Sequence, residues 1–276
     1  MKTIKAILLD LDGTLLSSDL SVSPENGRVL SEVLQNDIRV FLASGRPSQA
    51  IAKFVNLFSL DTIVLASNGG CVVDVNNHEV IFAFEMSGEL VHRVVEIAFT
   101  CGASPCVYSP TEWYVARIDS NVEIEMKRSG LTPKVVDLYS LTLPLIKVLI
   151  VGDNAALECC EKQIASNNEG LKYFYTYPEY LEVMPTNVSK GRARDAMLDY
   201  LGILPESVLA IGDGVNDLEL LEGVGVSVAM SNAHESIKRM SDYTTLSNND
   251  HGVAVAIRAL VLNDRSAFRK LLPKIA

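Results

Sequence analysis

Basic residues are scarce in this sequence. The 276-residue chain holds 24 Lys and Arg against 34 Asp and Glu, which gives a formal net charge of −10. A general nucleic-acid-binding protein needs a basic face, so this balance argues against that class. It does not argue against a small anionic substrate, because one lysine or one bound cation can reverse the charge locally.

Long apolar runs are also missing. No stretch of the sequence reaches the roughly 18 apolar residues expected of a membrane-spanning helix. The apolar run near the N-terminus is short and meets Asp10 at once, which does not fit a signal peptide. We therefore expect a cytoplasmic protein without a membrane partner, whose oligomeric state the sequence leaves open.

Cysteine and histidine are few and show no metal-site spacing. The chain has five cysteines, of which Cys101 and Cys106 lie too far apart for a CxxC pair, while Cys159 and Cys160 are adjacent. An odd number of thiols without a pattern predicts reduced, mostly buried cysteines. The four histidines are scattered, and we expect each of them on the surface or in the core rather than in catalysis.

Both ends of the chain alternate apolar strands with amphipathic helices. Near the N-terminus, strands are predicted at "IKAILLD", "IRVFLAS" and "TIVLAS", and helices at "SPENGRVLSEVLQND" and "PSQAIAKFVNLF". The first of these helices has Ser23 as a candidate N-cap and Pro24 at its first position. The C-terminal part repeats the alternation from "NVSKGRARDAMLDYLG" onward. Continuous apolar strands between such helices predict an α/β fold, a Rossmann-like parallel sheet with helices on both faces.

The middle of the chain follows a different pattern. Hairpin spacing begins at "VVDVNNHEVIFAFEM", and short strands then alternate with the helices "GELVHRVVEIAFT" and "NAALECCEKQIAS". We predict a compact α+β module over residues 83–186, inserted into a discontinuous core of residues 1–82 and 187–276. Trp113 and Tyr114 in this module either face a substrate or form its core; the sequence does not decide between the two.

Chemically competent side chains follow the predicted core strands. In an open parallel sheet, ligands bind outside the carboxyl ends of the strands. The stretches that follow the strands are "DLDGT" at Asp10, "SGR" at Ser44, "SNGG" at Ser67 and "DGVND" at Asp213, and Lys190 opens the helix before the last of these strands. Carboxylates, a hydroxyl, a lysine and glycine turns are therefore expected at one edge of the sheet.

These residue types suit phosphoryl transfer. Asp10 and Asp213 can share Mg²⁺ through oxygen ligands, which removes the repulsion between carboxylates at this edge. Asp10 can then attack phosphorus and form an aspartyl-phosphate, while Asp12 protonates the leaving oxygen and later deprotonates the hydrolytic water. Lys190, the Ser44 hydroxyl and backbone N–H groups at helix starts would hold the phosphoryl oxygens.

The ordered motifs "DLDGTL", "SGR", "SNGG", "SKG" and "GDGVND" resemble those of the haloacid dehalogenase superfamily. The position and length of the insertion are similar to the α+β cap of its Cof-type hydrolases. This resemblance implies a Mg²⁺-dependent phosphatase that hydrolyses small phosphorylated metabolites, such as sugar phosphates or phosphorylated cofactors, through an aspartyl-phosphate. It also implies a mobile cap that closes over the site and contacts the leaving group. The cap stretches "SPTEWY" and "YTYPEYLE" are candidates for the border of the closed site, and the sequence does not orient either one.

The resemblance also assigns roles to individual residues. Asp10 is the implied nucleophile and Asp12 the acid/base, and Mg²⁺ is held by Asp10, the backbone carbonyl of Asp12, and Asp213. Asp217 is expected to orient Lys190 or a metal-bound water. The implied phosphate-binding set is the backbone amides of Leu11 and Gly45 together with Ser44, Lys190 and Asn216. Further candidates for substrate contact are Arg46 and Asn68.

Two rival functions stay open at this point. Similar cores serve phosphomutases, which pass the phosphoryl group to a second hydroxyl instead of water. The same scaffold can also bind a phosphorylated ligand without catalysis, although the joint presence of Asp10, Asp12, Lys190 and Asp213 argues against a non-catalytic role.

Overall fold

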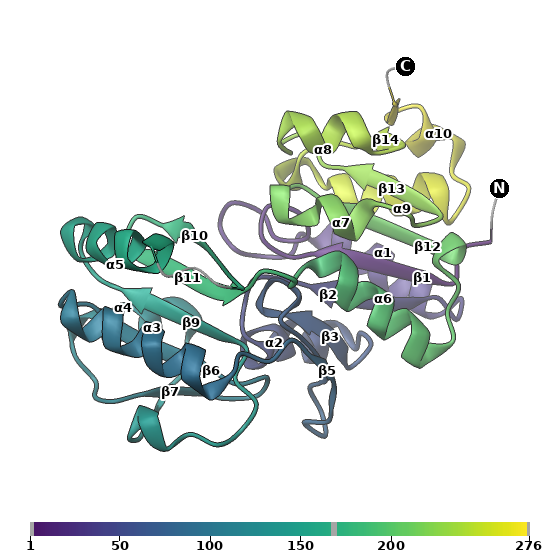
Figure 1. Ribbon diagram of the computed structural model, residues 1–276. Helices are drawn as coiled ribbons and strands as arrows, with labels where there is room; N and C mark the ends of the chain where they lie inside the picture. Colours follow the sequence, from purple (N-terminus) through teal and green to yellow (C-terminus); the bar gives the residue numbers. More distant parts are fainter. Residues whose placement is uncertain (1–2, 167–169, 275–276) are drawn as a thin grey trace.

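The computed structural model describes residues 3–166 and 170–274 of the chain, and within them the strands form two sheets (Figure 1). The larger sheet has nine strands and the smaller has six. In the described residues no helix is long and apolar enough to cross a membrane.

The nine-stranded sheet is parallel at its centre and antiparallel at its edges. Its strand order is β15-β14-β13-β12-β1-β2-β3-β4-β5, and the pairs from β14 to β3 are parallel. The edge strands β4, β5 and β15 pair antiparallel with their neighbours. The bounds are β1 Ala6–Asp10, β2 Arg39–Ala43, β3 Ile63–Ala66, β4 Cys71–Asp74, β5 Val80–Ala83, β12 Val208–Gly212, β13 Val226–Ala229, β14 Tyr243–Thr244 and β15 Leu272–Pro273.

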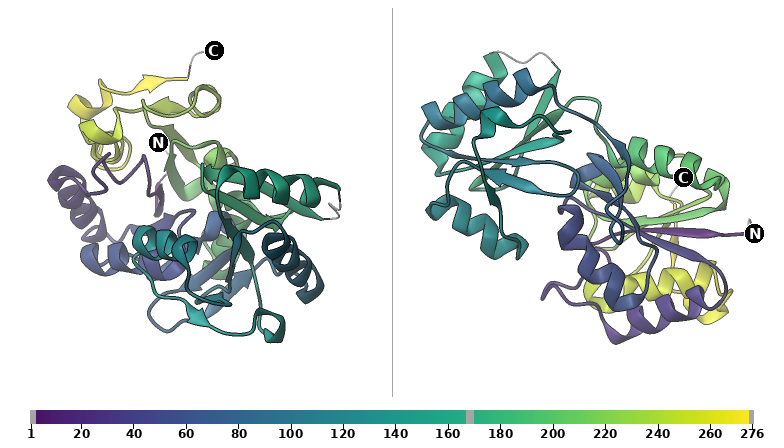
Figure 2. Two further views of the ribbon diagram at one scale, coloured as in Figure 1. Left: turned by 90° about the vertical axis from the view of Figure 1, so that its left-hand side faces the viewer. Right: turned by 90° about the horizontal axis from the view of Figure 1, so that it is seen from below.

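Helices cover both faces of this sheet (Figure 2). One face carries α6 and α7, and the other carries α1, α2 and α9. The helices are α1 Pro24–Leu34, α2 Ser48–Phe58, α6 Lys190–Leu201, α7 Leu218–Leu221, α8 Glu235–Met240, α9 Gly252–Leu260 and α10 Arg265–Phe268. The predicted start of α1 is confirmed, since the Ser23 side chain accepts a hydrogen bond from the Asn26 N–H and Pro24 is the first helical residue.

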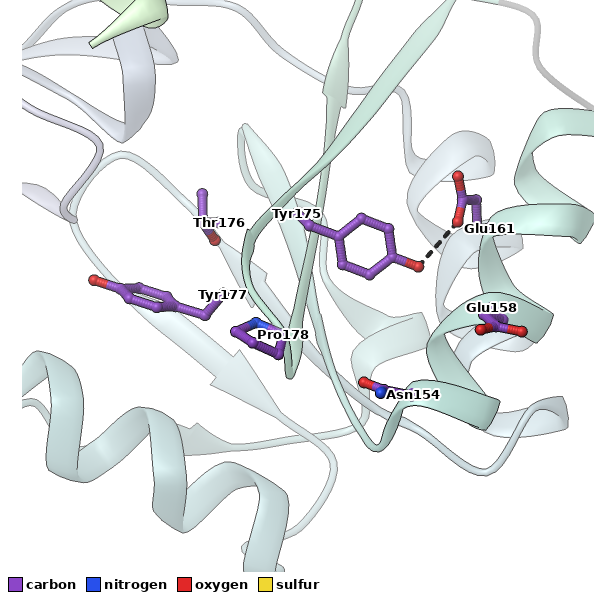
Figure 3. A pocket seen from close by; sticks show the side chains of 7 residues that line it. All are labelled: Asn154, Glu158, Glu161, Tyr175, Thr176, Tyr177 and Pro178. Atoms are coloured by element: carbon purple, nitrogen blue, oxygen red, sulfur yellow. Dashed lines mark hydrogen bonds between the residues drawn. The ribbon is translucent and has the colours of Figure 1, made fainter. Parts of the chain in front are cut away.

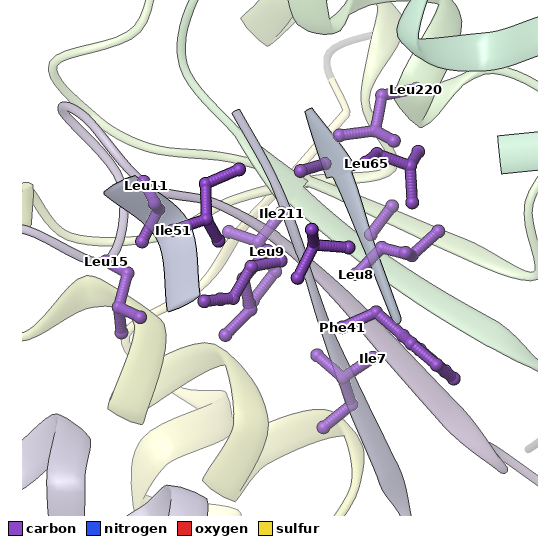
Figure 4. Packing of buried hydrophobic residues seen from close by; sticks show 14 of the residues in the cluster. Ile7, Leu8, Leu9, Leu11, Leu15, Phe41, Ile51, Leu65, Ile211 and Leu220 are labelled. Carbon is purple, nitrogen blue, oxygen red and sulfur yellow. The ribbon is translucent and has the colours of Figure 1, made fainter. Parts of the chain in front are cut away.

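Burial on both faces explains why the central strands are apolar throughout. Every residue of β1 is buried, and Ile7, Leu8 and Leu9 have no exposed surface. Their side chains pack with Phe41 of β2 and Ile211 of β12 (Figure 4). The predicted α/β fold with a Rossmann-like core is therefore confirmed.

The six-stranded sheet belongs to the inserted segment. Its order is β10-β11-β9-β6-β7-β8, and α3 and α5 pack on one face while α4 packs on the other. The bounds are β6 Ser104–Tyr108, β7 Trp113–Val115, β8 Lys134–Val135, β9 Lys147–Val151, β10 Leu171–Tyr177, β11 Tyr180–Pro185, α3 Gly88–Thr100, α4 Ser120–Ser129 and α5 Asn154–Ser166. We call this sheet and its three helices the cap.

Two features of the cap differ from the sequence interpretation. The expectation of reduced cysteines is wrong for one pair, because Cys101 after α3 and Cys159 on α5 form a disulfide, while Cys71, Cys106 and Cys160 are free and buried.

Helix α4 was not predicted; Asp119 caps its start, and Gly130 ends it with φ of 71°. Its apolar residues Val122, Ile124 and Met126 alternate in sequence, which masks the helical period.

Trp113 and Tyr114 are part of the cap core. Trp113 is 1% exposed and stacks on Tyr108, with ring centroids 5.6 Å apart. Tyr114 is buried in the cluster under α3 and α5. Of the two interpretations that the sequence left open for this pair, the structure supports packing.

Candidate active site

The predicted motifs converge at the carboxyl ends of four neighbouring strands. Strands β12, β1, β2 and β3 are parallel and adjacent, so their ends lie at one edge of the sheet. Asp10 ends β1, Ser44 follows β2, Ser67 follows β3 and Asp213 follows β12. Lys190 is the first residue of α6, whose start is capped by the Ser189 side chain.

Lys190 lies buried between two carboxylates. Its ammonium donates to Asp10 Oδ1 and to Asp217 Oδ1, both at 2.6 Å. Burial alone would lower the pKa of Lys190, but Asp10 and Asp217 outweigh it, and the pKa is raised. Burial and the charge of Asp217 raise the pKa of Asp10 well above its usual value, against the opposing effect of Lys190. The three groups therefore hold each other in fixed positions at the centre of the site.

Asp213 lies beside this group and is held by the turn after β1. Thr14 Oγ1 donates to Asp213 Oδ1 at 2.7 Å. Burial raises the pKa of Asp213 to about 6, although the bond from Thr14 acts in the opposite direction. Gly13 has φ of +82°, and a Cβ there would lie 2.3 Å from Asp213 Oδ2. Only glycine allows the turn and Asp213 to approach this closely.

The carboxylates fit a hard divalent cation. Oxygens of Asp10, Asp213 and Asp217 lie within 4.8 Å of one another. Both oxygens of Asp217 already accept hydrogen bonds, one from Lys190 and the other from the backbone N–H groups of Asp213 and Gly214. Asp10 and Asp213 are thus the pair with oxygens suited to Mg²⁺, which takes few carboxylates and keeps several waters.

Asp12 stands apart from this cluster and is bound by Arg46. Arg46 Nε lies 2.8 Å from Asp12 Oδ2, and Nη2 lies 2.5 Å from Oδ1. This hydrogen bonding raises the pKa of Arg46. The Asp12 side chain is 47% exposed, and both residues line the same cavity. Arg46, predicted as a substrate contact, reaches Asp12 in this structure, a pairing that the sequence did not reveal.

The loops after β2 and β3 meet the loop after β12. Asn216 Nδ2 donates to Asn68 Oδ1 at 2.9 Å. Asn68 has φ of 56°, and a Cβ on Gly45 would lie 3.0 Å from its Oδ1. Ser44 is buried, and its Oγ accepts from the Arg46 N–H at 3.1 Å. These predicted phosphate-binding and substrate-contact residues therefore line one side of the cavity.

Leu11 differs from the other predicted phosphate-binding residues. Its side chain is fully buried and packs in the core beneath the loop (Figure 4). Any contact of Leu11 with a phosphoryl group is therefore restricted to its backbone amide.

The cap closes the other side of a cavity of about 570 Å³. Polar cap residues line it: Glu125, Arg128, Lys147, Tyr177, Tyr180 and Glu182. Of the two stretches that the sequence offered for this border, "YTYPEYLE" supplies the last three, whereas "SPTEWY" does not line the cavity. The sequence interpretation missed Glu125, Arg128 and Lys147. A usable signal was present, because Lys147 and Glu182 are charged residues inside the apolar strands "IKVLIV" and "YLEVMP". A charged side chain on a strand that is otherwise buried usually needs a partner or a ligand.

Two of these residues flank the turn between β10 and β11: Tyr177 ends β10 and Tyr180 begins β11. Tyr177 lies on one side of the turn, and Tyr175 points the other way, toward α5, where its hydroxyl is 3.0 Å from Glu161 Oε2 (Figure 3). The loop between β6 and β7 instead contacts the core, since Ser48 Oγ donates to the Pro110 carbonyl at 2.6 Å. The cap is thereby seated on α2 at one end and reaches over the cavity at the other.

Comparisons with known proteins agree with this architecture. The sequence profile of the haloacid dehalogenase-like hydrolases matches residues 7–257. The structure is similar to that of a haloacid dehalogenase-like hydrolase from Bacteroides thetaiotaomicron, with a TM-score of 0.85 and 33% identity over 94% of this chain and 100% of that one.

Two Bacillus subtilis proteins are similar in sequence over nearly their whole length. Phosphatase YwpJ is 27% identical over 94% of this chain and 100% of its own. The 5-amino-6-(5-phospho-D-ribitylamino)uracil phosphatase YwtE is 26% identical over 94% of this chain and 98% of its own.

Proposed function

The chain belongs to the haloacid dehalogenase-like hydrolases, and on that premise we propose that it is a Mg²⁺-dependent phosphatase of small phosphorylated metabolites that works through an aspartyl-phosphate at Asp10. The observation that carries this proposal is the buried Lys190, bonded at 2.6 Å to both Asp10 and Asp217, with Asp213 beside them. The relatives named as phosphatases support the reaction class.

Asp10 is the nucleophile in this proposal. Lys190 holds Asp10 Oδ1, which leaves the second oxygen to attack phosphorus. In the first step the Asp10 oxygen bonds to phosphorus and the bond to the leaving oxygen breaks. In the second step water attacks the aspartyl-phosphate, which restores the Asp10 carboxylate and releases phosphate.

Asp10 and Asp213, with the backbone carbonyl of Asp12, would hold Mg²⁺. When bound, the cation neutralises the carboxylates and polarises the phosphoryl group. Lys190, Ser44 and Asn216, with the backbone amides of Leu11 and Gly45, would hold the phosphoryl oxygens as charge develops on them. Asp217 fixes Lys190 and the loop after β12 through its two oxygens, and so acts as a positioning residue.

Asp12 would move the proton in both steps. It donates a proton to the leaving oxygen in the first step and takes one from the attacking water in the second. Arg46 orients it, since two hydrogen bonds fix the plane of the Asp12 carboxylate. The cap, comprising residues 83–186, would exclude bulk water and contact the leaving group, while the core of residues 1–82 and 187–276 performs the chemistry.

A small leaving group fits the cavity of about 570 Å³, which lies within the size range of metabolite sites. One relative is named for a phosphorylated ribityl compound. Sugar phosphates and phosphorylated cofactors are the proposed classes.

Phosphate release from a panel of phosphorylated metabolites tests the proposal. We would compare wild type with Asp10→Asn, each with Mg²⁺ and with chelator, and use Asp199→Asn on the exposed side of α6 as the matched control. Release that requires both Mg²⁺ and Asp10, and survives in Asp199→Asn, supports a phosphatase. An isomerised product without free phosphate would indicate a mutase, and tight binding without turnover would indicate a non-catalytic protein.

A further inference from the structure

The cap presents a buried ion pair to the cavity opposite the catalytic carboxylates. Lys147 on β9 is 3% exposed and Glu182 on β11 is 6% exposed, and Lys147 Nζ lies 3.2 Å from Glu182 Oε2. The two strands are antiparallel neighbours, and Glu182 lies opposite Leu149 in the register. Lys147, Leu149 and Glu182 all line the cavity, so one face of the cap sheet forms its wall.

The fold itself gives no reason for this pair. Removing two charges from water costs several kcal/mol per ion, and well-packed apolar residues of similar size often serve stability equally well. Within the described residues, the Lys147 ammonium makes one hydrogen bond, to Glu182. An ammonium has three donors and a carboxylate has about four acceptor positions. Donors and acceptors therefore remain for a molecule in the cavity.

The neighbouring helix α4 continues the same wall. Glu125 is 5% exposed and accepts a hydrogen bond from the Tyr108 hydroxyl at 2.8 Å. Lys147 Nζ lies 4.9 Å from the centre of the Tyr108 ring. The hydroxyl of Tyr180, also buried at this wall, has no hydrogen-bond partner within the described residues. Burial and the neighbouring Glu125 carboxylate raise the pKa of the Tyr180 hydroxyl. The wall thus combines buried carboxylates, an ammonium and a phenol.

The cations of the wall are matched by carboxylates. Lys147 pairs with Glu182, and Arg128 on α4 pairs with Glu179 at 2.8 Å. The Arg128 guanidinium also lies over the Tyr177 ring, 3.7 Å from its centre. A second phosphate or a carboxylate on the leaving group would lie beside the carboxylates of Glu182 and Glu125, which repel it. Among the described residues of this wall, no unpaired buried cation would neutralise its negative charge.

We propose that Lys147 and Glu182 bind adjacent hydroxyl groups of the leaving group, so that the cap selects monophosphates of uncharged polyols. A hydroxyl accepts a hydrogen bond from the ammonium, and its neighbour donates one to the carboxylate, which satisfies both charges without separating them. This inference rests on the proposed phosphatase function and adds to it the groups that determine specificity.

The test replaces both charges together, because removing one alone leaves the other buried and unpaired. Lys147→Met/Glu182→Leu keeps similar volumes, and Lys134→Met/Glu112→Leu removes an exposed cap ion pair as the matched control. The substrates are ribitol 5-phosphate and pentyl phosphate, which has the same number of carbons without the hydroxyls. Urea unfolding of each variant verifies that it is folded.

Wild type is expected to have kcat/KM at least about 100-fold higher for ribitol 5-phosphate than for pentyl phosphate. The alkyl chain would displace water from the remaining donors of Lys147 and acceptors of Glu182 and offer them no partner. In Lys147→Met/Glu182→Leu, the ratio of kcat/KM for ribitol 5-phosphate to kcat/KM for pentyl phosphate should fall by at least about 10-fold. In the control Lys134→Met/Glu112→Leu, this ratio should stay unchanged. An equal loss on both substrates would mean that the pair only supports the fold and would overturn the inference. A wild-type preference for pentane-1,5-diol bisphosphate over ribitol 5-phosphate would also overturn it and would point to the exposed Lys53 on the core side of the cavity.

Failure of the proposed function is measured separately. If wild type releases no phosphate from either compound or from p-nitrophenyl phosphate, calorimetric binding of ribitol 5-phosphate and pentyl phosphate to the same three proteins still tests the inference. Tighter binding of the ribitol compound that disappears in Lys147→Met/Glu182→Leu sustains it; equal binding of the two compounds contradicts it.

Discussion

The Lys190 ammonium and the Asp10 carboxylate meet at 2.6 Å, although 180 positions separate them in the sequence. Asp10 ends the first strand of the core, and Lys190 begins α6 after the whole cap has been inserted. The contact exists only when both halves of the core are assembled, so the ion pair between Asp10 and Lys190 reports on the folding of the whole core. Asp217 accepts the second bond from Lys190 and completes the arrangement.

Loss of the Lys190 charge is expected to destabilise the protein strongly. Lys190→Met leaves Asp10 and Asp217 buried without a cation, and we expect the free energy of unfolding to fall by about 3–5 kcal/mol. Urea unfolding in chelator measures it, with the surface variant Lys238→Met as control, for which the change should stay within about 0.5 kcal/mol. The double variant Lys190→Met/Asp10→Asn should recover part of the loss; no recovery would argue against electrostatic coupling between the two.

Arg46 is expected to affect catalysis according to the leaving group. If Arg46 acts by orienting Asp12, Arg46→Met should lower kcat on alkyl phosphates, whose leaving oxygen needs a proton, by about 10² or more. On p-nitrophenyl phosphate, whose leaving group departs without protonation, the loss should be much smaller. Steady-state kinetics on both substrates measures the difference, with Lys53→Met as a second cavity variant. Equal losses on both substrates would assign Arg46 to phosphate binding instead.

Replacing Asp213 by a neutral residue is expected to stabilise the metal-free protein. The same replacement should abolish the additional stability that Mg²⁺ provides. Burial, together with the charge of Asp217, raises the pKa of Asp213 to about 6, so its charged form is disfavoured in the metal-free site. Asp213→Asn keeps an acceptor for Thr14 and should add about 1–2 kcal/mol to the stability in chelator at pH 7. Thermal unfolding with and without Mg²⁺ measures both effects.

In wild type, Mg²⁺ at about 100 times its Kd should add about 2.7 kcal/mol to the stability. Asp213→Asn should show almost none of this gain. If the variant responded to Mg²⁺ as wild type does, Asp213 would not be a ligand of the cation.

The motifs made much of the core site predictable. Four of the motifs follow apolar strands of the core, and parallel strands bring their carboxyl ends together, so the meeting of Asp10 and Asp213 follows from strand type. Lys190 reaches the same edge because it begins the helix that leads into β12. The pairing of Arg46 with Asp12 does not follow in this way. It depends on how two turns face each other across β1 and β2, and hydrophobic periodicity carries no information on that geometry.

The cap was less predictable, for different reasons. Lys147 and Glu182 come together through the antiparallel register of β9 and β11, which turn lengths and bulges determine. The expectation of reduced thiols failed for Cys101 and Cys159, which are 58 positions apart, because pairing depends on how α3 packs against α5. Spacing rules detect metal sites and cysteine pairs that are close in the sequence. They cannot detect a disulfide between two distant cysteines.

Identification of a phosphorylated Asp10 tests the central claim most directly. Asp12→Asn should slow hydrolysis of the intermediate while p-nitrophenyl phosphate, which needs no acid, still loads the site. After acid quench and borohydride reduction, mass spectrometry of the peptide that contains Asp10 should show homoserine at this position, and Asp10→Asn/Asp12→Asn should show none. Phosphate release by wild type together with a modification at another residue, or with none at Asp10, would contradict the account.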